Sequence, residues 1–120
     1  MVLLLVGLAG SLGASLRYVV DRFISTKTNA QFPLGTFVIN ATGSLLLGII
    51  EGMALRHHLS NTYATILGTG FCGAFTTFST YMYETFNLFV SKSYLQATLN
   101  LLGTTVICLC FAGLGLYVVS

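Results

Sequence analysis

The charged residues of the chain are separated by long apolar stretches, and this spacing limits what the chain can fold into. A bilayer core about 30 Å thick is crossed by about 20 helical residues, and the intervals between the charges are long enough for that. The charges fall at Arg17, Asp21, Arg22, Lys27, Glu51, Arg56, Glu84 and Lys92. Only 7% of the residues are charged and 55% are hydrophobic, whereas a soluble domain needs a more charged surface. The spacing therefore predicts an all-α membrane protein.

We expect one domain over residues 1–120 with four transmembrane helices, at residues 2–20, 34–55, 63–90 and 94–119. The first apolar stretch has the length of a signal peptide, but it lacks a basic n-region and three further spans follow it. We therefore interpret it as a retained helix. Only residues 25–33 have the composition of a genuine loop, which leaves no room for a soluble domain.

The distribution of basic residues gives a weak indication of orientation. The first and third loops carry Arg22, Lys27 and Lys92, with Arg17 close by, while the other side has Arg56 and the N-terminal amine. By the positive-inside rule this bias favours the first and third loops in the cytoplasm without fixing the orientation.

No motif for an enzyme is found in the sequence. The chain has no converging nucleophile, base and orienting group, and no nucleotide or metal motif. Cys72, Cys108 and Cys110 lie in predicted spans without ligand spacing, so we interpret them as small apolar fillers. We expect no catalysis and no nucleic-acid partner, with lipid as the surrounding medium.

Three polar residues lie at or near membrane depth, where an unpaired polar group is costly. Asn40 lies about two turns into the second span, and Thr36 lies one turn before it on the same face. Interhelical hydrogen bonding and a functional role both remain open for Asn40. Arg17, near the end of the first span, either reaches the lipid headgroups or has a functional role.

The segment GFCGAFTTFSTY, residues 70–81, is too apolar for a loop and too polar for an ordinary membrane helix. Its glycines and hydroxyl residues crowd into about three turns, where glycine weakens a helix and hydroxyls bond freed backbone groups. We therefore predict a break in the third helix between about Gly73 and Thr77, in the middle of the membrane. Carbonyls freed by such a break are suited to a small hard cation.

Beyond this predicted break, Phe78 and Tyr81 share a helix face that Glu84 continues outward. Aromatic ring edges are electropositive, so a row of ring edges and hydroxyl donors would suit a small anion that must lose its water. An aromatic stripe of this kind is also typical of ordinary packing, and both interpretations stay open on the spacing alone.

Three segments resemble the small fluoride channels of the Fluc or CrcB family over essentially the whole chain. They are GASLRY at residues 13–18, GTFVINATGSLLLG at 35–48 and GFCGAFTTFSTYMYE at 70–84. The resemblance implies passive export of fluoride across the cell membrane by a multi-pass protein. It also implies an antiparallel dimer, most simply of identical chains, that encloses two pores and a central structural sodium ion.

The resemblance also implies roles for individual residues. The carbonyls of Gly73 and Thr76 would hold the sodium ion at the dimer axis. Fluoride would pass residues that offer a ring edge, an amide or a hydroxyl, namely Asn40, Phe78, Ser79, Thr80, Tyr81 and, by a loose alignment, Thr104. Residues expected at a pore mouth or in a structural polar role are Arg17, Thr36 and Glu84.

Tyr81 departs from the family pattern, which has a second phenylalanine there. Its hydroxyl could narrow the pore, donate to the ion or mark a subunit whose second pore has decayed, so one subunit of an obligate heterodimer remains an alternative. A small proton-coupled multidrug transporter is a further alternative, but it needs a carboxylate deep in the first helix, and residues 2–16 have none. A purely structural membrane subunit would not explain the clustered hydroxyls.

Overall fold

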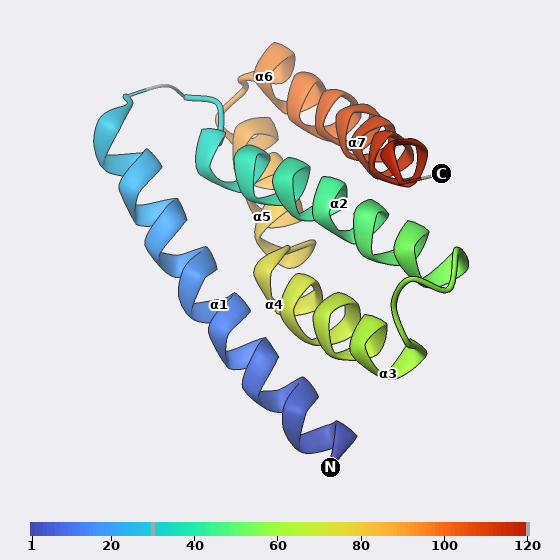
Figure 1. Cartoon of the computed structure of the whole chain (residues 1–120). Coiled ribbons are helices and arrows are strands. Elements are labelled where there is room, and N and C mark those ends of the chain that lie inside the picture. Colours follow the sequence, from blue (N-terminus) through green and yellow to red (C-terminus); the bar gives the residue numbers. More distant parts are fainter. Residues whose placement is uncertain (30, 120) are drawn as a thin grey trace.

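The computed structural model of the chain describes residues 1–29 and 31–119 and is helical, without strands, over that range. Residue 30, inside the loop predicted at 25–33, and residue 120 lie outside the described residues. The elements are α1 (Val2–Lys27), α2 (Leu34–Leu55), α3 (Asn61–Ala64), η1 (Thr65–Cys72), α4 (Gly73–Phe75), α5 (Ser79–Val90), α6 (Tyr94–Thr98), η2 (Leu99–Gly103) and α7 (Thr104–Val118), of which η1 and η2 are π-helical (Figure 1).

Three stretches of continuous helix are long and apolar enough to cross a membrane, and they match the predicted first, second and fourth spans. They are Val2–Lys27, Leu34–Leu55 and Tyr94–Val118. The predicted end of the first helix near residue 20 is wrong, because α1 continues to Lys27 and turns extended only at Thr28. Charged residues end an apolar stretch but do not break a helix, so hydropathy marked only its membrane-compatible part.

The predicted third span is two helical pieces rather than one helix. The first piece starts after Ser60, whose hydroxyl accepts a hydrogen bond from the Tyr63 amide, and continues through α3, η1 and α4 to Phe75. Thr76 is extended, with ψ 161°, and α5 begins at Ser79. The interruption therefore lies at 76–78, overlapping the C-terminal part of the predicted break, and each piece is shorter than a full membrane span.

Close backbone contacts hold the helices together, as expected where lipid competes with apolar side chains. In Figure 1, α2 and α7 lie side by side. A Cβ on Gly48 of α2 would overlap the Ala112 carbonyl of α7, so glycine is required for this approach. On the other side of the molecule, α1 packs on η1 and α4, where a Cβ on Gly13 would overlap the Phe71 carbonyl.

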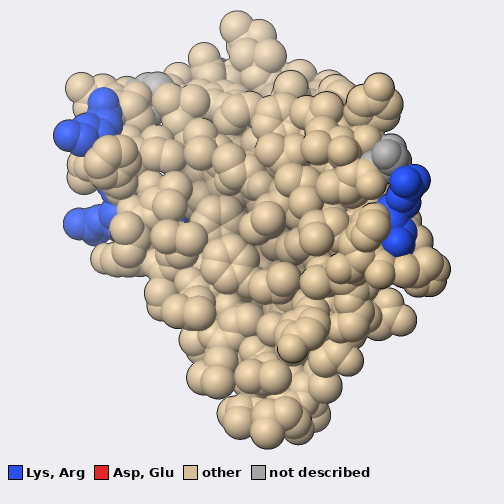
Figure 2. All heavy atoms as spheres, viewed as in Figure 1, with Lys and Arg blue, Asp and Glu red and all other residues tan. Residues whose placement is uncertain are grey.

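The first and third loops meet at one end of the molecule, as the order of the spans predicts. The side-chain amide of Gln31 donates a hydrogen bond to the Ser93 hydroxyl and links the two loops. The face in Figure 2 is almost free of charge, with Lys and Arg only at two opposite margins, one of them over the C-terminal part of α1. An uncharged belt between basic margins is typical of a surface that faces lipid.

Candidate functional site

The interruption of the third span is held by one side chain of α2. The Asn40 Oδ1 accepts a hydrogen bond of 2.8 Å from the Thr77 amide, and the Asn40 Nδ2 donates one of 2.9 Å to the Thr77 carbonyl. Both residues are buried. A Cβ on Gly43 would overlap the Thr76 methyl group, so glycine allows α2 to approach the interruption. Asn40 thus supplies the partners that Thr77 loses on leaving the helix.

The same contacts redirect two amides that would otherwise close helical hydrogen bonds. In an uninterrupted helix, the Gly73 carbonyl would accept from the Thr77 amide and the Thr76 carbonyl from the Thr80 amide. Here the Thr77 amide donates to Asn40, and the Thr80 amide donates to the Thr77 hydroxyl over 3.2 Å. The two carbonyls proposed from the resemblance are therefore among those that have lost their usual helical donors.

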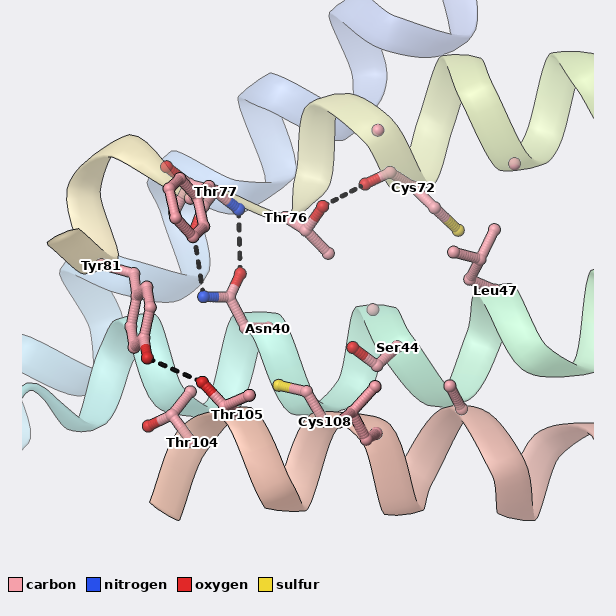
Figure 3. Close-up of a pocket in the computed structure, with 16 residues that line it drawn as sticks. Asn40, Ser44, Leu47, Cys72, Thr76, Thr77, Tyr81, Thr104, Thr105 and Cys108 are labelled. Atoms are coloured by element: carbon pink, nitrogen blue, oxygen red, sulfur yellow. Dashed lines mark hydrogen bonds between the residues drawn. The ribbon is translucent and has the colours of Figure 1, made fainter. Parts of the chain in front are cut away.

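A cavity of about 410 Å³ lies against the interruption, between α2, η1 and α7 (Figure 3). Its lining has no Asp, Glu, Lys, Arg or His side chain. The lining residues are Asn40, Gly43, Ser44, Leu47, Gly68, Cys72, Gly73, Thr76, Thr77, Phe78, Tyr81, Thr104, Thr105, Cys108, Leu109 and Ala112. Hydroxyls, one amide and two aromatic rings thus offer neutral dipoles to an occupant, without a fixed charge.

The two aromatic residues of the predicted anion path are adjacent but differ in environment. The Phe78 and Tyr81 ring centroids are 5.8 Å apart, with the rings tilted by 52°. Phe78 is 74% exposed, whereas Tyr81 is 5% exposed. The Tyr81 hydroxyl donates to the Leu101 carbonyl and lies 2.9 Å from the Thr105 hydroxyl, as Figure 3 shows for Thr105. It is therefore bonded to the α7 side of the cavity.

The other predicted hydroxyl positions divide between the cavity and the surface. Thr104 lines the cavity and is 2% exposed. Ser79 and Thr80 are exposed on the first turn of α5 and do not line it. The Ser79 hydroxyl lies 3.5 Å from that of Thr77. The structure thus brings Asn40, Phe78, Tyr81 and Thr104 together and leaves Ser79 and Thr80 beside them.

A buried polar cluster that sequence reasoning missed adjoins the cavity. The Thr104 hydroxyl donates to Asn100 Oδ1 over 3.2 Å, and Asn100 Nδ2 donates to the Thr85 hydroxyl over 2.7 Å. The Thr85 hydroxyl in turn donates to the Tyr81 carbonyl over 2.8 Å. The spacing in the sequence could have indicated both residues. Thr85 lies four residues after Tyr81, and Asn100 lies four residues before Thr104, so each shares a helix face with a predicted site residue.

A second cavity, of about 480 Å³, lies where the end of α1, the first loop and the end of α5 meet. Asp21 and Glu84 both line it, and Glu84 Oε1 is buried without a hydrogen-bond partner among the described residues. Thr36 is buried in the first turn of α2, next to the lining residue Gly35. Arg17 is half-buried, lines neither cavity and forms no ion pair within the described part of the chain.

Side-chain ligands do not gather into a metal centre in the part of the chain that the structure describes. No group of three or more His, Cys, Asp or Glu residues is close enough to hold a metal ion there. Cys72 and Cys108 line the first cavity, and Cys110 is exposed. Any cation at the interruption would therefore depend on backbone, hydroxyl or amide oxygens.

Comparisons with known proteins found one matching family and several similar proteins. The family described as CrcB-like protein, Camphor Resistance (CrcB), matches residues 4–116. The chain is 44% identical over 117 residues to "Fluoride-specific ion channel FluC 1" of Leifsonia xyli subsp. xyli, covering 98% of this chain and 85% of that protein. It is 47% identical over 103 residues to "Fluoride-specific ion channel FluC 2" of Clostridium acetobutylicum, covering 86% of this chain and 85% of that protein. It is 40% identical over 113 residues to "Fluoride-specific ion channel FluC" of Shewanella baltica strain OS155, covering 94% and 91% respectively.

Proposed function

Because the chain belongs to the CrcB-like family, we propose that it is a multi-pass membrane channel that exports fluoride passively from the cell. The observation that carries this proposal is the uncharged polar cavity at the interruption, lined by Asn40, Phe78 and Tyr81. The names of the relatives supply fluoride as the ion.

The chemistry of the cavity suits a small anion in transit. A fluoride ion that loses its water needs replacement donors, and a permeation path must bind the ion without holding it. Asn40 keeps a second Nδ2 proton after donating to Thr77, and Phe78 offers an electropositive ring edge. Neutral donors of this kind compensate for lost water while avoiding the tight binding that a buried lysine or arginine would cause.

We propose that the fluoride path extends from this cavity toward the second one, along the buried polar cluster. The cluster starts at Thr104 and Tyr81, which line the first cavity. It reaches Thr85, which precedes Leu88 of the second cavity by one helical turn on α5. Glu84 lines that second cavity, and Thr36 lies next to it, which supports a role for both residues near a pore mouth. Arg17, which lines neither cavity, fits a structural role.

Export needs no energy source beyond the membrane potential. Hydrogen fluoride enters a cell from acid surroundings and dissociates at neutral pH, which leaves the anion inside. A potential of 100 mV drives a monovalent anion outward by about 2.3 kcal/mol. The absence of a nucleotide motif in the sequence agrees with a passive pathway.

We further propose that the carbonyls of Gly73 and Thr76 hold a structural sodium ion. Both residues line the cavity, and their usual helical donors are bonded elsewhere. Backbone oxygens are hard ligands that suit such a cation. When bound, the ion would neutralise carbonyl dipoles that lipid cannot satisfy. Two carbonyls are few for one cation, so a second subunit would have to supply the remainder.

Following the family resemblance, we propose an antiparallel dimer with the ion on its axis and two pores around it, and the need for further cation ligands supports a second subunit. The exposure of Phe78 agrees with a site that a partner completes. A heterodimer remains the alternative because of Tyr81. Its hydroxyl is bonded to Leu101 and Thr105, however, so toward the cavity Tyr81 offers a ring much as phenylalanine would. This contact favours a homodimer.

Fluoride efflux from liposomes that contain only this chain tests the proposal. A channel made of identical chains releases fluoride without a second gene product. A heterodimer subunit or a purely structural subunit gives no more efflux than protein-free liposomes. The multidrug-transporter alternative needs a deep carboxylate in the first helix, and α1 has none before Asp21.

A further inference from the structure

Most hydroxyl protons in the cavity at the interruption are already bonded within the protein. The Thr76 hydroxyl donates to the Cys72 carbonyl over 2.9 Å, and that of Thr105 donates to the Leu101 carbonyl over 2.7 Å. The Thr104 hydroxyl donates to Asn100. These three residues therefore present oxygen lone pairs rather than protons to an occupant of the cavity, and an anion must find its donors elsewhere.

Among the residues that line this cavity, Ser44 is the one whose hydroxyl has no hydrogen-bond partner among the described residues. It lies on α2 one turn after Asn40 and is half-buried. Figure 3 shows this hydroxyl in the cavity between the Thr76 side and Cys108, on the same stripe of α2 as Asn40 and Leu47.

Hydroxyls that bond to no described residue occur at exposed positions of these helices, as at Thr62 and Thr98, whereas the buried Thr85 and Thr104 hydroxyls both donate hydrogen bonds. Serine and threonine in a helix commonly donate to the carbonyl three or four residues earlier. Ser11 does so to Gly7 over 3.0 Å, Thr42 to Val38 over 2.7 Å and Thr65 to Asn61 over 2.9 Å. A half-buried hydroxyl at membrane depth without a partner is costly. The Ser44 proton is thus available to an occupant of the cavity.

The surroundings of Ser44 favour an anion as that occupant. The cavity has no carboxylate to attract a cation and no ammonium or guanidinium to hold an anion permanently. Gly43, between Asn40 and Ser44, is where α2 meets Thr76 at the interruption. Asn40 and Ser44, which line the cavity on either side of that contact, thus each keep a neutral donor proton that no described residue accepts.

We propose that the Ser44 hydroxyl donates a hydrogen bond to fluoride as a second donor one helical turn from Asn40. This inference rests on the proposed function, since it names a further residue of the same ion path. The role belongs to Ser44 and not to Thr76, Thr104 or Thr105, because the hydroxyl protons of these three residues are bonded within the protein. A proton donor to the ion would change how flux depends on fluoride concentration, whereas a packing residue would change only assembly.

The test compares Ser44→Ala and Ser44→Cys with the wild-type chain in fluoride-loaded liposomes. Alanine removes the donor, and cysteine keeps nearly the same shape with a much weaker one. We expect both variants to need about a tenfold higher fluoride concentration for half-maximal flux, as for loss of a hydrogen bond to an ion. Ser44→Thr keeps the hydroxyl and should retain flux. Ser11→Ala removes a hydroxyl that bonds only within α1 and serves as the matched control.

The outcomes separate this inference from the proposed function. If the wild type releases no fluoride, the proposed function fails and Ser44 loses its role with it. If the wild type conducts and Ser44→Cys shows the wild-type concentration dependence, only the Ser44 inference is overturned, even where Ser44→Ala fails to assemble. A shift in Ser44→Cys that is absent from Ser44→Thr and Ser11→Ala supports it.

Discussion

Asn40 and Thr77 form a closed pair of hydrogen bonds, in which one side-chain amide bonds both the N–H and the C=O of a single backbone residue. The two residues are 37 positions apart in the chain, so the pair joins α2 to the interruption of the third span. Asn40 therefore stabilises the interruption, and its remaining Nδ2 proton is available to an ion.

Asn40→Asp is predicted to abolish fluoride flux and to lower stability. The carboxylate cannot donate to the Thr77 carbonyl, and its charge repels both that oxygen and an anion. We expect the free energy of unfolding to fall by about 1–3 kcal/mol, the cost of leaving a buried group unbonded. Thermal unfolding in detergent and flux in liposomes measure the two effects, with the exposed Thr42→Ala as the control. A stable, conducting Asn40→Asp protein would contradict both roles.

Phe78→Ile should remove fluoride flux while the dimer stays assembled. Phe78 is largely exposed within one chain, so its replacement by another large apolar residue costs little folding energy. Isoleucine has no electropositive ring edge to offer an anion. Size-exclusion chromatography checks assembly and a fluoride electrode checks flux. Unchanged flux in an assembled Phe78→Ile protein would rule out the ring-edge contact.

Tyr81→Phe should conduct fluoride nearly as well as the wild type but unfold more easily. The hydroxyl is bonded to Leu101 and Thr105, so its loss removes a contact between α5 and α7 and leaves the ring beside Phe78. We expect a loss of about 1 kcal/mol in the free energy of unfolding. Thr105→Val should cost less in this background than in the wild-type chain, because its contact with the Tyr81 hydroxyl is already lost. A loss of flux in Tyr81→Phe would instead mean that the hydroxyl serves the ion.

Sodium should be needed for assembly and not for transport. Purification with a large organic cation in place of sodium is expected to lower the dimer fraction or the flux, because the carbonyls of Gly73 and Thr76 lose their ligand. Readdition of sodium provides the control. Fluoride flux should not change when a sodium gradient is imposed in either direction. Sodium-coupled fluoride movement would turn the proposed channel into a transporter.

The sequence predicts the membrane helices and the region of the interruption well, because both depend on local properties. Apolar length defines three of the spans, and the glycine and hydroxyl cluster around Thr76 marks where the helix ends. The predicted end of the first helix near residue 20 was wrong because Asp21 and Arg22 end an apolar stretch without ending the helix. The position of the interruption at 76–78 depends on Asn40 and Gly43 of another helix, which no local pattern reveals.

The candidate site was predictable only in part for the same reason. The spacing of Phe78 and Tyr81 placed two rings on one face, and they do lie together. Whether a hydroxyl donates to its own helix, to a neighbour or to the cavity depends on the packing of two helices. For that reason Asn100 and Ser44 were missed.

The central claim is that this chain alone forms a passive fluoride channel, and fluoride efflux under a controlled membrane potential tests it most directly. Purified protein is reconstituted into liposomes loaded with potassium fluoride, and external fluoride is followed after valinomycin is added to let potassium leave. We predict rapid fluoride efflux that depends on valinomycin, with no comparable loss of chloride from matched chloride-loaded liposomes. Efflux no faster than from protein-free liposomes, or equal release of chloride, would contradict the claim.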